Sequence, residues 1–281
     1  MNSKIIGIVI LVVAIGGASA YFLSKSDTID SVSENEFVTQ NEKIGLVINS
    51  ISPPKNIIEL ENVYKTASTS GIGRTNLYVH WDQLEPEEGN FDWRVTDIMM
   101  KLNQKYNLKT TLYFSVINAD RLGPFPSWMG NQIIGKSLET DTIRVLNEIL
   151  SRYENIDYVI FGGDIDYHFQ RATGSIPIYK EFFDNVSSEI KSKHPDVKIG
   201  NSLSLENVIN KGMEPGGTFE LTPQLEMGDF IALSYKPTNT VGDIDRTSQE
   251  AINDLKKTLE IFSSYKLAFF EISWSTSDLS L

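Results

Sequence analysis

The feature that most constrains the fold is a regular alternation of short apolar runs and longer amphipathic stretches after residue 43. Repeated β/α alternation of this kind requires a parallel sheet, so the chain belongs to the α/β class. The strand-like runs lie at residues 44–48, 75–79, 109–114, 158–161, 197–200, 230–234 and 267–270. Helical spacing of apolar residues occurs at 57–67, 95–105, 141–153, 178–193 and 251–262. Seven such units predict a (β/α)8 barrel rather than an open doubly wound sheet.

The expected barrel is one unit short. The chain ends ten residues after Glu271, so neither an eighth strand nor the last two helices can be placed behind it. We therefore expect residues 43–281 to form an incomplete barrel domain whose last βα unit is missing from this chain. The missing unit would be explained if the chain is truncated or if a second chain closes the barrel.

The first 23 residues form a separate hydrophobic segment. Residues 5–23 carry no charge and are long enough to cross a bilayer as a helix. Lys4 before the segment favours a cytoplasmic start, and residues 18–20 (Ala-Ser-Ala) resemble a cleavage site. Residues 1–23 are therefore predicted to be a signal peptide or a membrane anchor. Residues 24–42 have the polar composition of a flexible linker.

Composition excludes several function classes. The formal net charge is -12 and no local basic patch is present, so nucleic acid is not an expected partner. The chain has no cysteine, which excludes disulfides and thiolate chemistry. No glycine-rich dinucleotide turn and no P-loop occurs, and the three histidines lack metal-binding spacing. We expect neither a cofactor nor a metal, and the sequence does not indicate an oligomeric state.

Two acids follow predicted strands. The run at 158–161 ends in Gly162-Gly163-Asp164, and Glu271 directly follows the last predicted strand. In a barrel of this kind the active site lies at the carboxyl ends of the strands. Glycosidic hydrolysis needs two carboxyl groups that converge on one pocket. The alternative is that these acids lie in a solvent-exposed loop and take no part in a reaction.

Four segments carry a family resemblance. They are Trp81-Asp-Gln-Leu-Glu-Pro-Glu-Glu-Gly-Asn-Phe-Asp92, Gly162-Gly-Asp-Ile-Asp166, Ser234-Tyr-Lys-Pro237 and Phe270-Glu-Ile-Ser-Trp274. In this order they resemble the retaining glycoside hydrolases of the TIM-barrel superfamily called clan A, in particular the β-galactosidase and endo-galactanase type. The resemblance covers most of residues 43–281.

The resemblance implies roles for three residues. Glu271 matches the nucleophile, Asp164 matches the acid/base, and Tyr235 matches the tyrosine that hydrogen-bonds the nucleophile. The family has Asn-Glu where this chain has Gly163-Asp164. This departure removes the amide that holds the 2-hydroxyl of the sugar and shortens the acid by one methylene group. Asp164 is then expected to act as a weaker acid, to work at a longer separation in an inverting mechanism, or to belong to a binding pocket. Ser273 stands where the family has glycine.

The remaining candidates surround that pair. Trp274 and Trp128 are expected either to stack on a sugar ring or to pack in the protein. His80 and His168 are expected at the rim as hydrogen-bond donors to hydroxyl groups. Asp166 is an alternative acid.

The long loop after the second predicted strand begins with Trp81 and Glu85. These two residues are expected to fix the loop, with Glu85 in a salt bridge. Trp81 is also a candidate substrate contact, as is Gly163.

Together these features predict a glycosidase that cleaves β-glycosidic bonds of oligosaccharide or polysaccharide outside the cell, secreted or tethered through residues 5–23. The alternative is a non-catalytic surface protein that uses a degenerate glycosidase barrel to bind glycans or to act as a scaffold. A structural envelope protein without a sugar site is a third possibility. A carbohydrate is the expected partner in the first two cases.

Overall fold

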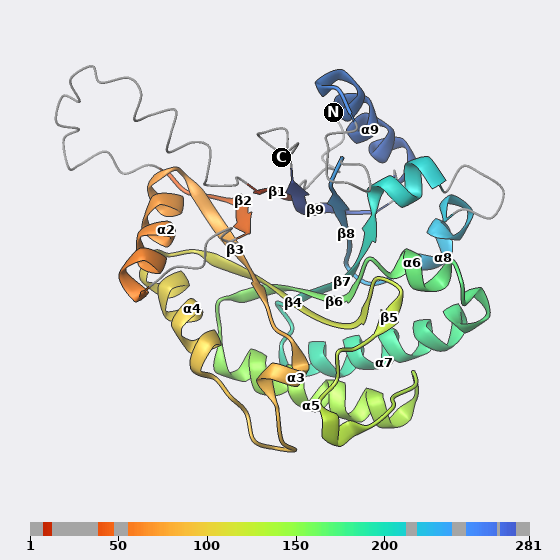
Figure 1. Ribbon diagram of the computed structural model, residues 1–281, viewed down its shortest axis with the longest axis horizontal. Coiled ribbons are helices and arrows are strands. Elements are labelled where there is room, and N and C mark those ends of the chain that lie inside the picture. Colours follow the sequence, from red (N-terminus) through yellow and green to blue (C-terminus); the bar gives the residue numbers. More distant parts are fainter. Residues whose placement is uncertain are drawn as a thin grey trace, which may run out of the picture.

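The computed structural model describes residues 8–12, 39–47, 56–211, 218–237, 246–262 and 265–273. Eight of the strands it describes are parallel and hydrogen-bond in the order β3-β2-β1-β9-β8-β7-β6-β4, and β3 also pairs with β4. The pairings therefore complete a circuit, and the predicted TIM-barrel-like fold is confirmed (Figure 1). The strands are β1 (Ile8–Val12), β2 (Asn41–Val47), β3 (Ile72–Tyr78), β4 (Lys109–Asn118), β6 (Ile156–Gly163), β7 (Lys198–Ser204), β8 (Phe230–Tyr235) and β9 (Leu267–Ser273). A two-residue strand, β5 (Arg121–Leu122), pairs antiparallel with the end of β4.

Helices lie outside the strands, as the β/α alternation requires (Figure 1). All five predicted helices are confirmed: α2 (Ile57–Thr69), α4 (Arg94–Lys105), α5 (Lys136–Arg152), α7 (Ile176–Lys193) and α9 (Ser248–Ile261). Shorter helices occur in the connections: α3 (Trp81–Leu84), α6 (Ile165–Phe169), α8 (Thr222–Leu225), and the turns η1 (Ser127–Met129), η2 (Thr173–Ser175), η3 (Asn207–Lys211) and η4 (Phe219–Leu221).

Local sequence signals explain where two of these helices begin. The side chain of Asn56 accepts hydrogen bonds from the backbone N–H groups of Ile58 and Glu59, which satisfies free donors at the start of α2. At the start of α9, Thr247 and Glu250 form a capping box.

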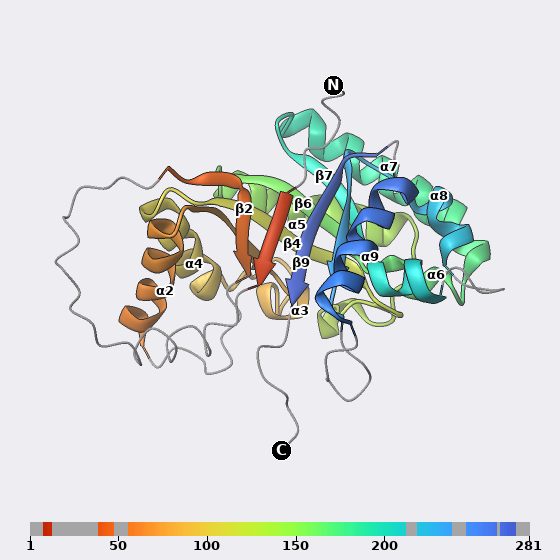
Figure 2. The same ribbon diagram turned by 90° about the horizontal axis from the view of Figure 1, so that it is seen from above.

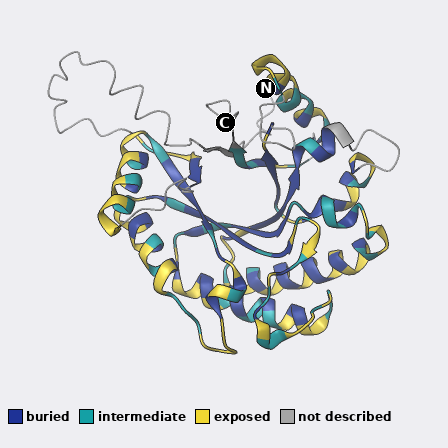
Figure 3. Ribbon diagram, viewed as in Figure 1, coloured by how far each residue is buried: buried dark blue, intermediate teal, exposed yellow. Residues whose placement is uncertain are grey.

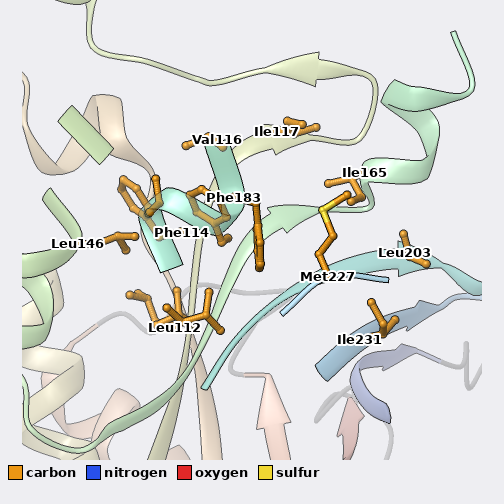
Figure 4. Packing of buried hydrophobic residues seen from close by; sticks show 14 of the residues in the cluster. Leu112, Phe114, Val116, Ile117, Leu146, Ile165, Phe183, Leu203, Met227 and Ile231 are labelled. Atoms are coloured by element: carbon orange, nitrogen blue, oxygen red, sulfur yellow. The ribbon is translucent and has the colours of Figure 1, made fainter. Parts of the chain in front are cut away.

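The main hydrophobic core fills the layer between the barrel and its helices. Outward-facing strand residues such as Phe114 pack there against helix residues such as Leu146 on α5 and Phe183 on α7 (Figure 4). Strands β3, β4, β6, β7 and β8 are consequently mostly buried, whereas the outer faces of the helices are exposed (Figure 3).

A second, smaller cluster fills the inside of the barrel. It consists of Val47, Tyr113, Ile160, Phe230, Ala232, Ala268 and Phe270. At the amino-terminal end of the strands, Arg74 is buried and pairs with Asp157 at 2.6 Å. Described side chains therefore fill the interior of the barrel, and in such barrels the active site lies at the carboxyl ends of the strands.

The eighth strand position is filled by a segment for which we predicted a helix. β1 lies between β9 and β2, with Val9 paired to both Ile44 and Phe269 (Figure 2). The expected N-terminal hydrophobic helix is therefore corrected to a strand at Ile8–Val12. The sequence Ile-Val-Ile-Leu-Val is rich in β-branched residues and suits a buried parallel strand, and the neighbouring strand edges offer unpaired backbone groups.

Most of the other N-terminal predictions fall on residues outside the described ranges. The rest of segment 5–23 and most of the expected linker lie there, although β2 already begins at Asn41. Among the described residues, no helix combines the length and the apolar character needed to cross a membrane.

Candidate active site

The end of β6 is shaped by two glycines that have no room for a side chain. A Cβ atom on Gly162 would lie 2.4 Å from Tyr179 Oη, and one on Gly163 would lie 1.6 Å from Tyr113 Oη. Both distances are far below van der Waals contact, so larger residues are excluded here. The chain then turns at Asp164, whose φ of 47° is left-handed.

Asp164 is held at the mouth of the barrel by two serines from neighbouring strands. Ser202 on β7 donates a hydrogen bond to Asp164 Oδ1 at 2.9 Å, and Ser234 on β8 donates to the same oxygen at 3.0 Å. Burial raises the pKa of the Asp164 carboxyl, whereas the two serine hydroxyls act to lower it. The net effect is a raised pKa, which suits a general acid.

Glu271 reaches the same mouth because β9 contains a bulge. Leu233 on β8 pairs with Phe269, but the next residue, Ser234, pairs with Glu271, so Phe270 is skipped in the register. Phe270 packs inside the barrel with Ala268, as alternation along the strand requires. The bulge turns Glu271 to the same side, where it contacts Tyr78 and Lys236 at the mouth. Bulges often re-aim a side chain at an active site.

Both oxygens of Glu271 have partners. Oε1 forms a salt bridge with Lys236 Nζ at 2.9 Å, and Oε2 accepts a longer hydrogen bond from Tyr78 Oη at 3.3 Å. The side chain remains 17% exposed. The Glu271 carboxylate is therefore oriented but still open to solvent.

A third carboxylate, Glu206, lies at the same end of the barrel. One of its oxygens accepts a hydrogen bond from the backbone N–H of Lys236, and the other accepts from Ser204 Oγ at 3.2 Å. Burial raises the pKa of Glu206, and the charge of Asp164 adds to the increase. Lys236 thus lies among three acids and is a cation that partly offsets their charge.

Aromatic rings lie beneath the carboxylates. Tyr113 stacks on Phe270 with ring centroids 5.2 Å apart and planes at 12°, and Tyr78 lies 5.0 Å from Tyr113. Burial raises the pKa of the Tyr113 hydroxyl, and the charges of Asp164 and Glu271 contribute in the same direction. The two phenols therefore stay protonated and can donate hydrogen bonds.

The structure thus brings the two predicted catalytic acids to one end of the barrel. The charge of Glu271 acts to raise the pKa of Asp164, which is the coupling expected of neighbouring carboxyl groups. One acid has an environment that favours its proton, and the other forms an ion pair with a lysine. Such a difference between two carboxyl groups is the arrangement used by enzymes that need one proton donor and one carboxylate.

The predicted hydrogen bond from Tyr235 to Glu271 is wrong. Tyr235 is buried and donates to Asp254 Oδ2 on α9 at 2.9 Å. Side chains alternate along a strand, so once Ser234 faces the barrel interior, Tyr235 must face the helices. Tyr78 on β3 provides the hydrogen bond to Glu271 instead.

Asp166 is a core residue in this structure rather than a substrate contact. It is fully buried, it accepts hydrogen bonds from Ser204 N at 2.9 Å and from Asn207 Nδ2 at 2.5 Å, and so it ties α6 to the segment after β7. Burial raises the pKa of Asp166 to about 7, with a contribution from the charge of Asp164.

The loop after β3 is fixed as the sequence predicted. Glu85 is fully buried and pairs with both guanidinium nitrogens of Arg144, at 2.7 and 3.0 Å. Trp81 is also buried and donates to Glu85 Oε2 at 2.9 Å, which leaves it no surface for a sugar. Trp128 donates to the Glu85 carbonyl at 3.1 Å, so it packs over this ion pair.

Four candidates remain: His80, His168, Gly163 and Trp274. His80 is exposed at the start of α3, and His168 on α6 lies 3.4 Å from the Asp120 carbonyl. Gly163 uses its N–H to donate to Ser115 Oγ and its carbonyl to accept from Ala119 N. Trp274 lies outside the described residues, as does the side chain of Ser273.

A polar hollow of about 680 Å³ lies at the opposite end of the barrel and is lined by residues that include Asp97, Lys101, Lys109 and Arg152. Asp97 and Arg152 form a bidentate ion pair there, with oxygen to nitrogen distances of 2.7 and 2.8 Å. No catalytic candidate lines the hollow. Within the described ranges, no group of three or more His, Asp or Glu side chains is placed to hold a metal ion.

Sequence reasoning missed six residues of the site: Tyr78, Tyr113, Ser202, Glu206, Ser234 and Lys236. Ser234 and Lys236 flank Tyr235 in a segment that the sequence did single out. Glu206 follows a predicted strand by a few residues, so its position was a usable signal. The inward direction of Tyr113 could not be read from an apolar run without alternation.

Comparison with solved structures shows that known proteins share this fold. The β-glycosidase BGL167 superposes with a TM-score of 0.58 over 79% of this chain and 68% of that protein, at 12% identity. The chain shares the fold of β-glycosidases. The β-glucosidase 1317 gives a TM-score of 0.55 at 13% identity, over 79% of this chain and 69% of that one.

A third glycosidase shares the same fold over a smaller part of its length. The exo-β-1,4-mannosidase Op5Man5 from Opitutaceae bacterium strain TAV5 gives a TM-score of 0.52 at 16% identity, over 76% of this chain and 42% of that protein. This chain therefore spans about two thirds of the first two proteins and less than half of the mannosidase. No protein-family model matches the sequence.

Proposed function

We propose that the protein is a β-glycosidase in which Asp164 is the general acid/base and Glu271 is the nucleophile. The observation that carries the proposal is the contrast between the two acids at one barrel mouth. Burial raises the pKa of Asp164, so this carboxyl favours its protonated form, whereas Glu271 forms an ion pair with Lys236. The glycosidases that share the fold support a carbohydrate as the substrate.

The mechanism follows from the two environments. Asp164 donates its proton to the glycosidic oxygen while Glu271 attacks the anomeric carbon, so that the bond to the leaving alcohol breaks as the glycosyl-enzyme bond forms. Asp164, now ionised, then takes a proton from water, and the resulting hydroxide equivalent displaces Glu271. Ser202 and Ser234 stabilise the ionised form of Asp164 in this second step.

Hydrolysis of a panel of aryl β-glycosides by the purified protein tests the proposal. We expect turnover of at least one member, and a loss of about 10³-fold or more in both Glu271→Gln and Asp164→Asn. Glu154→Gln is the control, because Glu154 is an exposed acid at the opposite end of the barrel. A folded protein that hydrolyses no member of the panel would contradict the proposal.

A non-catalytic glycan-binding role is the second candidate. It is favoured by the salt bridge between Lys236 and Glu271, because an ion-paired carboxylate is a weaker nucleophile. Saturable binding of an oligosaccharide without turnover, measured by titration calorimetry, would distinguish this role from catalysis.

We also propose that the protein acts outside the cell, tethered or secreted through residues 1–23. The support is the uncharged run at residues 5–23. The same residues cannot occupy the bilayer and complete the barrel as β1 at one time. Cell fractionation combined with N-terminal sequencing of the mature protein tests this, and an intact N-terminus in the cytoplasmic fraction would contradict it.

A further inference from the structure

We propose that Tyr113 is the residue that binds the sugar hydroxyl next to the reacting carbon, the 2-hydroxyl, and so sets a requirement for that group in the substrate. This inference rests on the proposed glycosidase function and assigns a specificity-determining role within that site. It is carried by the place of the Tyr113 hydroxyl relative to Gly163, Asp164 and Glu271.

The first observation is that the phenol occupies the space beside residue 163. A Cβ atom built on Gly163 would lie 1.6 Å from Tyr113 Oη and 2.5 Å from the ring carbon that carries it. Any side chain at position 163 would therefore extend into the volume that the hydroxyl fills. The polar group beside Gly163 is therefore supplied by β4 instead of by β6.

The second observation is that the hydroxyl is held in place. The Tyr113 ring stacks on Phe270 at 5.2 Å, contacts Tyr78 at 5.0 Å, and is only 9% exposed. A ring packed on two sides keeps its hydroxyl at one position, which is what selective binding of a hydroxyl group requires.

The third observation is that the proton of this hydroxyl is donated over a long distance. Its acceptor is Asn118 Oδ1 at 3.4 Å, a distance at which a hydrogen bond is weak, and a hydrogen bond with Ser115 acts to lower the pKa of the phenol. Tyr78, the neighbouring phenol, already donates to Glu271. A substrate hydroxyl can therefore replace Asn118 as the partner of Tyr113 at little cost.

The fourth observation is that Tyr113 contacts the chain neighbours of both acids. Its hydroxyl lies against Gly163, which precedes Asp164, and its ring stacks on Phe270, which precedes Glu271. The charges of Asp164 and Glu271 accordingly both act on the Tyr113 hydroxyl. A sugar whose anomeric carbon lies between these two acids presents the hydroxyl of the adjacent carbon to the groups beside them. Hydrogen bonds to the 2-hydroxyl strengthen in the transition state of glycoside hydrolysis, so this contact would contribute to rate as well as to binding.

The test compares Tyr113→Phe with wild-type protein on two matched substrates, an aryl β-glycoside that the wild type hydrolyses and its 2-deoxy analogue. We expect kcat/KM for the glycoside to fall about 10- to 100-fold, and kcat/KM for the 2-deoxy analogue to change by less than about threefold. Tyr158→Phe is the matched control, because Tyr158 lies at the opposite end of β6, near Arg74.

The outcomes separate the two claims. Equal losses on both substrates, or no loss on either, would overturn the role of Tyr113 while the glycosidase function stands. A wild-type protein that hydrolyses neither substrate would remove the proposed function, and this inference with it. A melting temperature of Tyr113→Phe close to that of wild type would show that a selective loss does not come from unfolding.

Discussion

Lys236 Nζ lies 2.9 Å from Glu271 Oε1, so the proposed nucleophile is held by a cation from the neighbouring strand end. Because Tyr78 contributes only a longer hydrogen bond of 3.3 Å, Lys236 is the main partner that orients the carboxylate. The same lysine sits among the acids and acts to lower the pKa of Asp164.

Loss of Lys236 should therefore impair catalysis without abolishing it. We expect Lys236→Met to lower kcat/KM by about 10- to 100-fold, since a charge-assisted contact that fixes the carboxylate is lost. Lys198→Met is the control, because Lys198 lies at the start of β7, at the opposite end of the barrel. Unchanged or higher activity in Lys236→Met, measured by steady-state kinetics, would argue that the ion pair does not orient Glu271.

The serine contacts of Asp164 should be visible in the pH profile. Ser234 donates to the ionised carboxylate and so lowers the pKa of Asp164, and its removal must raise that pKa. Because the general acid acts in its protonated form, the alkaline limb of kcat/KM should move to higher pH in Ser234→Ala. A hydrogen bond worth about 1 kcal/mol corresponds to a shift of about 0.7 pH unit. A shift to lower pH would contradict this assignment.

Asp166 should make the protein less stable as pH rises. Its pKa is raised from 3.8 to about 7 in the folded state, so between these values the native protein binds more protons than the unfolded chain. The free energy of unfolding must then fall as pH increases from about 4 to about 7.

Asp166→Asn cannot ionise, and so it should remove this part of the pH dependence and gain stability relative to wild type above pH 7. Urea unfolding at pH 5 and pH 8 measures the effect, with the exposed Asp196→Asn as control. Equal pH dependence in Asp166→Asn and wild type would show that Asp166 is not the group responsible.

Gly163 should tolerate no side chain while Tyr113 is present. We expect Gly163→Ala to lower the free energy of unfolding by about 1–3 kcal/mol, because its Cβ would overlap the Tyr113 hydroxyl. Gly174→Ala is a matched control, since nothing lies within 4 Å of its Cβ position.

A double-mutant cycle identifies the cause of that loss. Tyr113→Ala removes the overlapping atoms, so Gly163→Ala/Tyr113→Ala should be less destabilised than the sum of the two single variants. Simple additivity of the two losses would mean that the glycine is needed for another reason.

The sequence was sufficient to predict a barrel, because its apolar residues recur with clear strand and helix spacing. Each predicted strand and helix from residue 44 onward is confirmed within a few residues. It also placed Asp164 directly after its strand, whereas Glu271, predicted to follow the last strand, lies within β9 near its carboxyl end. It could not predict the direction of Tyr235, because the β9 bulge and the alternation on β8 together decide which residues face inward. Nor could it place β1, since an apolar β-branched run of this length suits either a membrane helix or a buried strand.

The residues that hydrogen-bond or ion-pair with Asp164 and Glu271 could not be predicted from the sequence, for a physical reason. Ser202, Ser234 and Lys236 come from strands other than those of the acids they contact, and only the closure of the barrel brings them together. Glu85 and Arg144 show the same limit, because the salt bridge was predicted but its cation, 59 residues away, was not.

The identity of the nucleophile is the central claim, and covalent trapping tests it most directly. Incubation with a 2-deoxy-2-fluoro β-glycoside that carries an activated leaving group, followed by peptide mass spectrometry, should reveal one glycosyl unit attached to Glu271 and none in Glu271→Gln. A glycosyl adduct on another residue, or turnover of the parent glycoside with inversion of the anomeric carbon and no adduct, would contradict the account.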